Sequence, residues 1–442
     1  MIPSFEKPST APVKFNLKRR IIFVAATKSK RRLVRFSILG LVALSGAARA
    51  QSVITPPPPS VSTTPPAIEA LGPGEMQVFP PNSVAANLMD ELHPLQWGPV
   101  TLRPHANYQF TYGTGVRFST NQPPADTIVQ TFSPGILFEL GEHWTLDYTP
   151  SFTFYSDKNF KNTVGQAVTL TGGTVYEDWV LGLSQSFSYS KSPQVETGTQ
   201  TEEQTYVTSL TASHALNSKV SVDLSASQNL SFPTDFQSSK EWSTMDWVNY
   251  EFWPRLVVGA GVGIGYTAAT PDSLNEQLQG RVNWRATDKI SFGVSGGAQL
   301  MQYTEGGESP LINPIYSASI QYQPFEHTQF SFTASRAVST SSYYKNQVTE
   351  NTTISGMVSQ RLFQRFTLSV NGGYIWTDYV GAAAATDVNP PIDNYYVTVS
   401  LGTSVFKRGS VSVFYTYNQT ITDQVGQAYV SNQVGFNLGY AF

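Results

Sequence analysis

The chain contains no cysteine, little charge and, after its first fifty residues, no long apolar run. The absence of cysteine in 442 residues excludes disulfides and thiolate metal sites. Charged residues make up only 13%, against about a quarter in a typical soluble domain. No segment beyond residue 50 offers the roughly 18 consecutive apolar residues of a transmembrane helix. If the body of the chain enters a membrane, it must form a closed β-barrel, because only helices and closed barrels satisfy every backbone polar group in lipid.

The few charges are unevenly distributed along the chain. Residues 1–50 hold eleven Lys or Arg and a single acid, Glu6, so residues 51–442 keep 17 basic and 30 acidic residues, a net charge of −13. The basic head (residues 1–50) and the acidic body (residues 51–442) are therefore separate parts of the chain with different roles. An acidic body argues against nucleic acid as a partner, because phosphate binding needs a basic surface.

The basic head has the three parts of an export signal. Basic residues from Lys28 to Arg35 precede an apolar core, FSILGLVAL, and then the cleavage motif of Ala48 and Ala50, which is followed by Gln51. The alternative is a membrane-anchor helix, but the apolar core is shorter than the about 20 residues that cross a bilayer. We predict that residues 1–50 are a signal peptide. Residues 51–97 are rich in proline, which predicts an extended periplasmic linker with a short helix over residues 82–92.

From residue 98 onward the sequence alternates with a period of two, the signature of β-strands. In WTLDYTPSFTFY, from Trp144 to Tyr155, one face is aromatic or apolar and the other is polar. The pattern recurs every 34 to 44 residues, which indicates a repeated structural unit. The later starts are Trp179, Val220, Leu256, Ile290, Thr328, Phe366 and Ser410.

The connections alternate between tight turns, such as 141–143, and longer polar stretches, such as 190–201. Aromatic residues gather at two levels about ten residues apart along the strands. At about 3.3 Å per residue and a strand tilt near 40°, this separation is roughly 25 Å, the height of the apolar band of a membrane barrel. We predict an all-β, up-and-down antiparallel transmembrane barrel of about 18 strands (16–20) over residues 98–442, with short periplasmic turns and longer extracellular loops. A soluble β-propeller, whose blades also repeat near 40 residues, is the alternative fold.

The chain ends on a strand, GFNLGYAF, whose one face carries Phe436, Leu438, Tyr440 and Phe442. This ending resembles the C-terminal signal of outer-membrane barrels, although Asn437 stands where that signal commonly has glycine. The resemblance implies that these four residues form an assembly signal, with the barrel-assembly machinery as a partner.

Two stretches of residues 98–155, GPVTLRPHANYQFTYGTGV and DTIVQTFSPGILFELGEHWTLDYTPSFTFY, carry a further resemblance. They are similar to bacterial families of outer-membrane β-barrel porins, some of them linked to exopolysaccharide gene clusters. The resemblance implies a location in the bacterial outer membrane and brings no functional residue with it.

The sequence offers little support for catalysis. No H-x-x-H or HExxH spacing exists among the five histidines, so we expect no metal site and no cofactor. His214 is the only strand histidine whose alternation points outward, and the residue two before it is Ala212, so the serine of a lipase is missing there. The glycine-rich run from Gly259 to Gly265 lies in a strand, where it eases curvature or leaves room for something inside. We therefore predict that the protein is not an enzyme.

The inward face is mostly Ser, Thr, Asn, Gln and Gly, as in a water-filled lumen. Seven charged residues point inward near the tight-turn end, where they either pair and brace the wall or form a mixed-charge constriction. Our reading is a passive channel for small hydrophilic solutes in contact with outer-membrane lipid; the alternative is a non-conducting structural or export-associated barrel. The sequence does not indicate the oligomeric state. The seven residues are Arg103, Glu139, Asp147, Glu251, Arg281, Arg285 and Arg361.

Overall fold

The computed structural model describes residues 95–116, 125–193, 200–234, 236–269, 272–304, 310–340, 347–381, 390–406, 408–423 and 428–441. The predicted signal peptide with Ala48 and Ala50, the linker up to residue 94, its short helix and Phe442 lie outside the described residues. The chain divides into two units, Met1–Ala47 and Ala48–Phe442, and every described residue belongs to the second.

The described residues are almost entirely β-strand, and no helix among them is long and apolar enough to span a membrane. The strands are β1 (Leu95–Trp97), β2 (Val100–Val116), β3 (Ala125–Leu140), β4 (Trp144–Tyr155), β5 (Thr163–Tyr176), β6 (Trp179–Pro193), β7 (Gln200–Ala215), β8 (Val220–Pro233), β9 (Ser239–Trp253), β10 (Leu256–Ala268), β11 (Ser273–Thr287), β12 (Ile290–Tyr303), β13 (Leu311–Phe325), β14 (Thr328–Thr340), β15 (Gln347–Leu362), β16 (Phe366–Gly381), β17 (Ile392–Val405), β18 (Gly409–Thr422) and β19 (Tyr429–Ala441).

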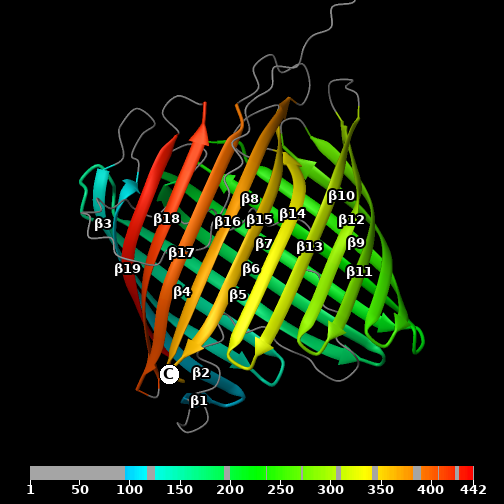
Figure 1. The fold of residues 1–442 in the computed structure, drawn as a ribbon, viewed down its shortest axis with the longest axis horizontal. Helices are drawn as coiled ribbons and strands as arrows, with labels where there is room; N and C mark the ends of the chain where they lie inside the picture. Colours follow the sequence, from blue (N-terminus) through cyan, green and yellow to red (C-terminus); the bar gives the residue numbers. More distant parts are fainter. Residues whose placement is uncertain are drawn as a thin grey trace, which may run out of the picture. The chain divides into compact units, whose positions relative to one another are not determined.

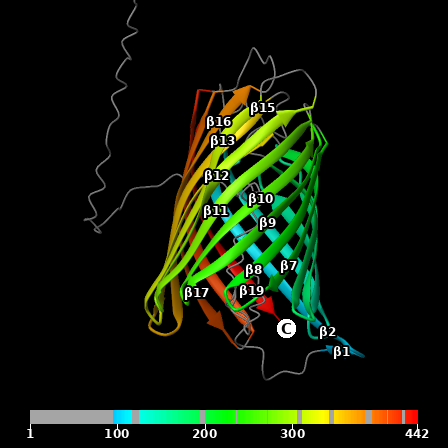
Figure 2. The same ribbon diagram turned by 90° about the vertical axis from the view of Figure 1, so that its right-hand side faces the viewer.

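Eighteen of these strands, β2 to β19, form one closed antiparallel barrel. Each pairs with the next along the chain, and β19 pairs with β2 from Asn432↔Thr114 to Ala441↔His105, which closes the ring. The three-residue β1 only extends the start of β2. Figures 1 and 2 show the strands tilted around the barrel. The predicted fold, with its strand number and up-and-down order, is confirmed, and a propeller is excluded because the strands form a single sheet.

Tight turns join the strands at one end of the barrel, where the last strand also ends (Figure 1). Between β15 and β16 the chain passes from Leu362 to Phe366, and both Phe363 and Gln364 adopt positive φ, at 49° and 60°. Two successive positive φ angles are typical of type I′ turns, whose twist matches that of an antiparallel strand pair. At the opposite end more residues separate consecutive strands, as between the end of β16 at Gly381 and the start of β17 at Ile392.

The two faces of the barrel wall differ as the alternation predicts. In β10, Val262 and Ile264 are 58% and 61% exposed on the outer face, while Gly261 and Gly263, which alternate with them, are buried on the inner face. Exposed Val, Ile, Leu and aromatic side chains continue around the outside of the barrel, on strands from β2 to β19. A wall whose outer face is this apolar is stable only against lipid.

The inner face carries more apolar side chains than the sequence analysis expected. Met245 and Trp247 of β9, Met301 of β12 and Ile315 of β13 are all at most 7% exposed and belong to the inward phase of their strands. The inner face is therefore less polar than predicted on the β9–β13 side, where buried apolar residues pack on the inside of the wall.

Candidate functional site

Charged residues gather on the inner wall in separate groups, the first of which lies on β2, β3 and β4. The Nε atom of Arg103 lies 2.7 Å from Oε1 of Glu139, and both side chains are partly buried. Beside them, Nε2 of His105 lies 3.2 Å from Oδ1 of Asp147, which also accepts a hydrogen bond from Thr149 at 2.8 Å. His105 is two residues beyond Arg103 and so shares its face by the period-two alternation, but nothing in the sequence indicated that His105 pairs with Asp147.

Gly135 of β3 is what lets this first group form. A Cβ atom on this residue would come within 2.3 Å of Cε1 of His105 and 2.6 Å of Oγ1 of Thr149. The imidazole therefore lies over bare backbone, and this position is closed to any side chain while the ring stays in place.

The second group is centred on Arg281 of β11, whose side chain is only 8% exposed. Its guanidinium forms an ion pair with Asp223 of β8 and donates to Oδ1 of Asn249 of β9 at 2.9 and 2.6 Å. Asn249 in turn donates to Oδ2 of Asp223 at 2.8 Å, and Ser213 of β7 donates to Oδ1 of Asp223 at 2.6 Å. This network ties four strands, and every charge in it is paired.

The glycine run of β10 accounts for the position of this second group. A Cβ atom on Gly259 would lie 2.6 Å from Oδ1 of Asn249, and one on Gly261 would lie 2.6 Å from the indole ring of Trp247. A Cβ atom on Gly263 would lie 2.8 Å from the sulfur of Met245. The sequence left two explanations for this glycine run, eased curvature or space for another group inside the barrel, and the structure supports the second. The run is a groove, and the side chains of β9 occupy it.

The three remaining charged residues of the predicted set belong to neither group. Glu251 of β9 is Cα partner to Val257, two residues beyond Asn249. Arg285 is exposed and follows the last regular pair of β11 with β12. Arg361 is exposed and donates from Nε to the carbonyl of Gln364 in its own turn, at 3.0 Å. Among the described residues, neither arginine forms an ion pair.

The seven predicted residues therefore do not form one contiguous cluster. In a closed ring of eighteen strands, β2 and β11 are nine strands apart in either direction, so the Arg103 and Arg281 groups lie on opposite walls. In each group the arginine is paired with a carboxylate. Of the two readings left open by the sequence, this arrangement favours bracing of the wall for Arg103, Glu139, Asp147 and Arg281.

Sequence reasoning missed further residues of the inner wall. Asp223 is the counter-ion of Arg281, and its inward phase in VSVDLSASQNL was a usable signal. Arg336 of β14 forms an ion pair with Glu350 of β15, and both side chains are largely buried. No pattern in the sequence indicated this second pair, because the alternation of β14 assigns Arg336 to the outer face.

The C-terminal strand places three residues of the predicted assembly signal on the outer face. Leu438 and Tyr440 are 41% and 49% exposed, and Phe436 stacks on Phe110 of β2 with ring centroids 5.3 Å apart. The apolar face of this strand therefore contributes to the seam that closes the barrel. Its role as an assembly signal stays a prediction.

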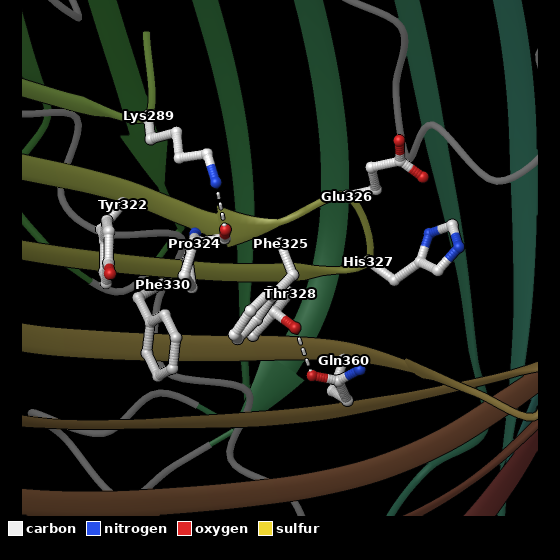
Figure 3. Close-up of a pocket in the computed structure, with 9 residues that line it drawn as sticks. All are labelled: Lys289, Tyr322, Pro324, Phe325, Glu326, His327, Thr328, Phe330 and Gln360. Carbon is white, nitrogen blue, oxygen red and sulfur yellow. Dashed lines mark hydrogen bonds between the residues drawn. The ribbon is translucent and has the colours of Figure 1, made fainter. Parts of the chain in front are cut away.

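An open recess of about 910 Å³ lies at the tight turn between β13 and β14, outside the lumen (Figure 3). The rings of Tyr322 and Phe330 stack there with centroids 5.9 Å apart, and Phe325 beside them is 70% exposed. Lys289 donates from Nζ to the carbonyl of Pro324 at 2.7 Å. The recess belongs to the group of aromatic residues near the tight turns. Its composition is typical of the membrane interface, where aromatic rings and lysine are common.

The closed antiparallel barrel, the apolar outer face and the aromatic residues near both ends define the class of this protein. It is a transmembrane β-barrel of the bacterial outer-membrane type, and the outer membrane is its location.

Comparison with protein-family models gives no match, and comparison with curated proteins gives none either. Solved structures similar to this chain include OccK3 (OpdO) of Pseudomonas aeruginosa, at 12% identity and a TM-score of 0.41, covering 77% of this chain and 95% of that one. OccAB3 of Acinetobacter baumannii has 8% identity and a TM-score of 0.43, covering 77% and 99%. The siderophore receptor PirA of Pseudomonas aeruginosa has 10% identity and a TM-score of 0.40, covering 77% and 80%. At these identities and TM-scores, none of what those proteins bind or transport is transferred to this chain.

Proposed function

We propose that the protein is a passive channel for small hydrophilic solutes across the outer membrane, with no catalytic role. The observation that carries the proposal is the closed ring of eighteen strands with polar and charged side chains on its inner face. Barrels of 16–18 strands enclose more space than their inward side chains fill, and they leave an aqueous path.

The charges on the inner wall favour a channel of weak selectivity. Arg103 with Glu139, Arg281 with Asp223, and Arg336 with Glu350 each pair a cation with a carboxylate. Paired charges impose a smaller net field on a passing ion than a ring of one sign. Arg285 and Arg361, which have no ion pair among the described residues, are the inward cations best placed to bias the turn-side mouth.

A second function, a non-conducting structural or export-associated barrel, is favoured by one observation. Polar inner-face residues toward the long-loop end are almost fully buried, as for Gln433 at 1%, Thr111 at 2% and Asn418 at 3% exposed. In an open tube such side chains would face water. Part of the inner wall is therefore covered, and the proposal of a channel requires that the cover leaves a path beside it.

Permeation into vesicles separates the two functions. The purified barrel is inserted into lipid vesicles that contain an impermeant polymer, and the swelling rate is followed in isotonic solutions of sugars of increasing size. A channel gives a rate that falls with the size of the sugar, whereas a closed structural barrel gives the rate of protein-free vesicles for every sugar. Lipid, the assembly machinery and the diffusing solutes are the partners that this proposal includes.

A further inference from the structure

Toward the long-loop end, β14 separates from β13, while its hairpin partner β15 stays paired with β16 as far as Gln347↔Gly381. The pairing of β13 with β14 runs from Phe325↔Thr328 to Tyr316↔Arg336 and stops there, although β13 starts at Leu311 and β14 continues to Thr340. β14 nevertheless stays paired with β15 as far as Thr340↔Val348. Figure 1 shows the upper part of β14 turning away from β13. We call residues 336–340 and 347–350 the hairpin end.

The hairpin end lies on the inside of the barrel. Val338 is 4% exposed and packs in one cluster with Met301 and Val348, both at 0%. Met301 belongs to the inward phase of β12, because its Cα partner in β11 is the buried Asn275. Gln277, Gln279, Ser295 and Gln299, all on the inner face of β11 and β12, line a small cavity together with Arg336, Ala337 and Val338.

The same face of β14 therefore has two different surroundings along its length. Phe330 and Phe332 are 38% and 42% exposed on the lipid side. Val338, six residues beyond Phe332 and in the same phase, is buried against the inner wall. Because the alternation does not change between them, the end of β14, with the end of β15 that is paired to it, has turned inward from the line of the wall.

An ion pair joins β14 and β15 where β14 separates from β13. Arg336 and Glu350 are 22% and 14% exposed in their side chains, and they come from opposite strands of the hairpin. A charge-assisted pair that is largely withdrawn from water holds its two strands in one arrangement more firmly than an exposed pair does. The packing of Val338 and Val348 against Met301 holds the hairpin end on the wall, and the ion pair fixes its direction.

We propose that the hairpin end is the element that limits the size of solutes passing through the lumen. This inference rests on the proposed channel function. The hairpin end is seated on the inner face of β11, β12 and β13, so it occupies cross-section that the eighteen-strand ring would otherwise leave to water. Releasing it from the inner face of β12 changes the width of the path while β15 stays paired with β16 in the ring.

The position of the hairpin end is tested by cross-linking, for which the chain offers no interfering cysteine. The pair Val338→Cys and Met301→Cys is introduced, the barrel is folded in lipid, and a short bifunctional thiol reagent is added. We expect an intramolecular cross-link, seen as altered mobility of the denatured chain. The matched control joins Met301→Cys to Phe332→Cys, which lies on the same strand but on the lipid side, and it should give none. A failure of the first pair, or equal yields from both, overturns the inference.

The effect on passage is tested with a charge placed in the Val338 contact. Val338→Asp should release the hairpin end and raise single-channel conductance by about twofold or more. Thr333→Asp adds the same charge to the lumen-facing side of the same strand, away from the contact, and should leave the conductance within the wild-type range. An unchanged conductance of the Val338→Asp variant, with its fold confirmed by gel shift, overturns the limiting role. The two failures stay distinct: a wild-type protein without conductance removes the channel proposal, while the cross-link reports on the hairpin end alone.

Discussion

The guanidinium carbon of Arg281 lies 4.4 Å from the centroid of the Trp247 ring, inside the barrel wall. The cation is thus held between an aromatic face and the carboxylate of Asp223. Contacts of this kind are worth more when water is excluded, and Arg281 is 8% exposed. Arg281 belongs to the wall structure and is shielded from the path of a solute.

The first prediction concerns this residue. Arg281→Met should reduce the free energy of unfolding by about 2 kcal/mol, because it leaves the carboxylate of Asp223 without its charged partner. Arg285→Met, at an exposed position four residues along, is the matched control and should change stability by less than about 0.5 kcal/mol. Urea unfolding in lipid vesicles, followed by tryptophan fluorescence, measures both. Equal effects of the two substitutions would show that Arg281 does not brace the wall.

The groove of β10 gives a second prediction. Gly261→Val should lower stability by about 1–3 kcal/mol, because the new side chain overlaps the indole ring of Trp247. Gly280→Ala, on the neighbouring strand, should be close to neutral, since its Cβ would find nothing nearer than a carbonyl oxygen at 3.9 Å. The same unfolding assay compares them, and a neutral Gly261→Val variant would mean that Trp247 does not lie over this glycine.

A third prediction tests the two faces of the wall. Val262→Arg places a charge on the lipid side and should cost about 2–4 kcal/mol near the middle of the bilayer. Thr333→Arg, exposed on the lumen side, should be tolerated. Gly263 is a poor control for this purpose, because a Cβ there would lie 2.8 Å from the carbonyl oxygen of Thr244. The folded fraction in vesicles is the readout, and similar fractions for the two arginine variants would reverse the assigned faces.

The fourth prediction concerns the end of the chain. Deleting Phe442, or changing it to Asp, should lower the amount of folded barrel in the outer membrane, because the terminal aromatic completes the face of Phe436, Leu438 and Tyr440. Phe442→Tyr keeps the aromatic ring and is the control. Heat-dependent gel mobility of membrane extracts reports the folded amount, and wild-type levels of the deleted variant would remove Phe442 from the assembly signal.

The period-two alternation was sufficient to predict the barrel, since one face of every strand must meet lipid and the other must not. The strand number followed from the spacing of the tight turns. The alternation was less informative on β9, where Trp247 and Val248 put apolar residues on both faces. It also gave no warning at the hairpin end, because the phase of β14 is unbroken from Phe332 to Val338. Period two defines which residues share a face, but it does not define what that face contacts.

The pairing of the inward charges could not be predicted from the sequence for a related reason. Arg281 and Asp223 are 58 residues apart and meet only because three strand registers align them across β8 to β11. Arg103 and Glu139 lie on the adjacent strands β2 and β3, so only one strand register had to be known to predict their pairing. Register depends on turn lengths and bulges, such as the shift between Trp284 and Thr287, that single-sequence patterns do not define.

Electrical recording from single molecules in a planar lipid bilayer tests the central claim, a water-filled path through the eighteen-strand barrel, most directly. The purified protein, shown to be folded by its gel mobility, is added to one side at a fixed voltage. We expect stepwise conductance increases of uniform size and a small reversal potential under a salt gradient, because most inner-wall charges are paired. A folded protein that inserts into the bilayer and gives no conductance steps would contradict the channel and favour the closed structural barrel.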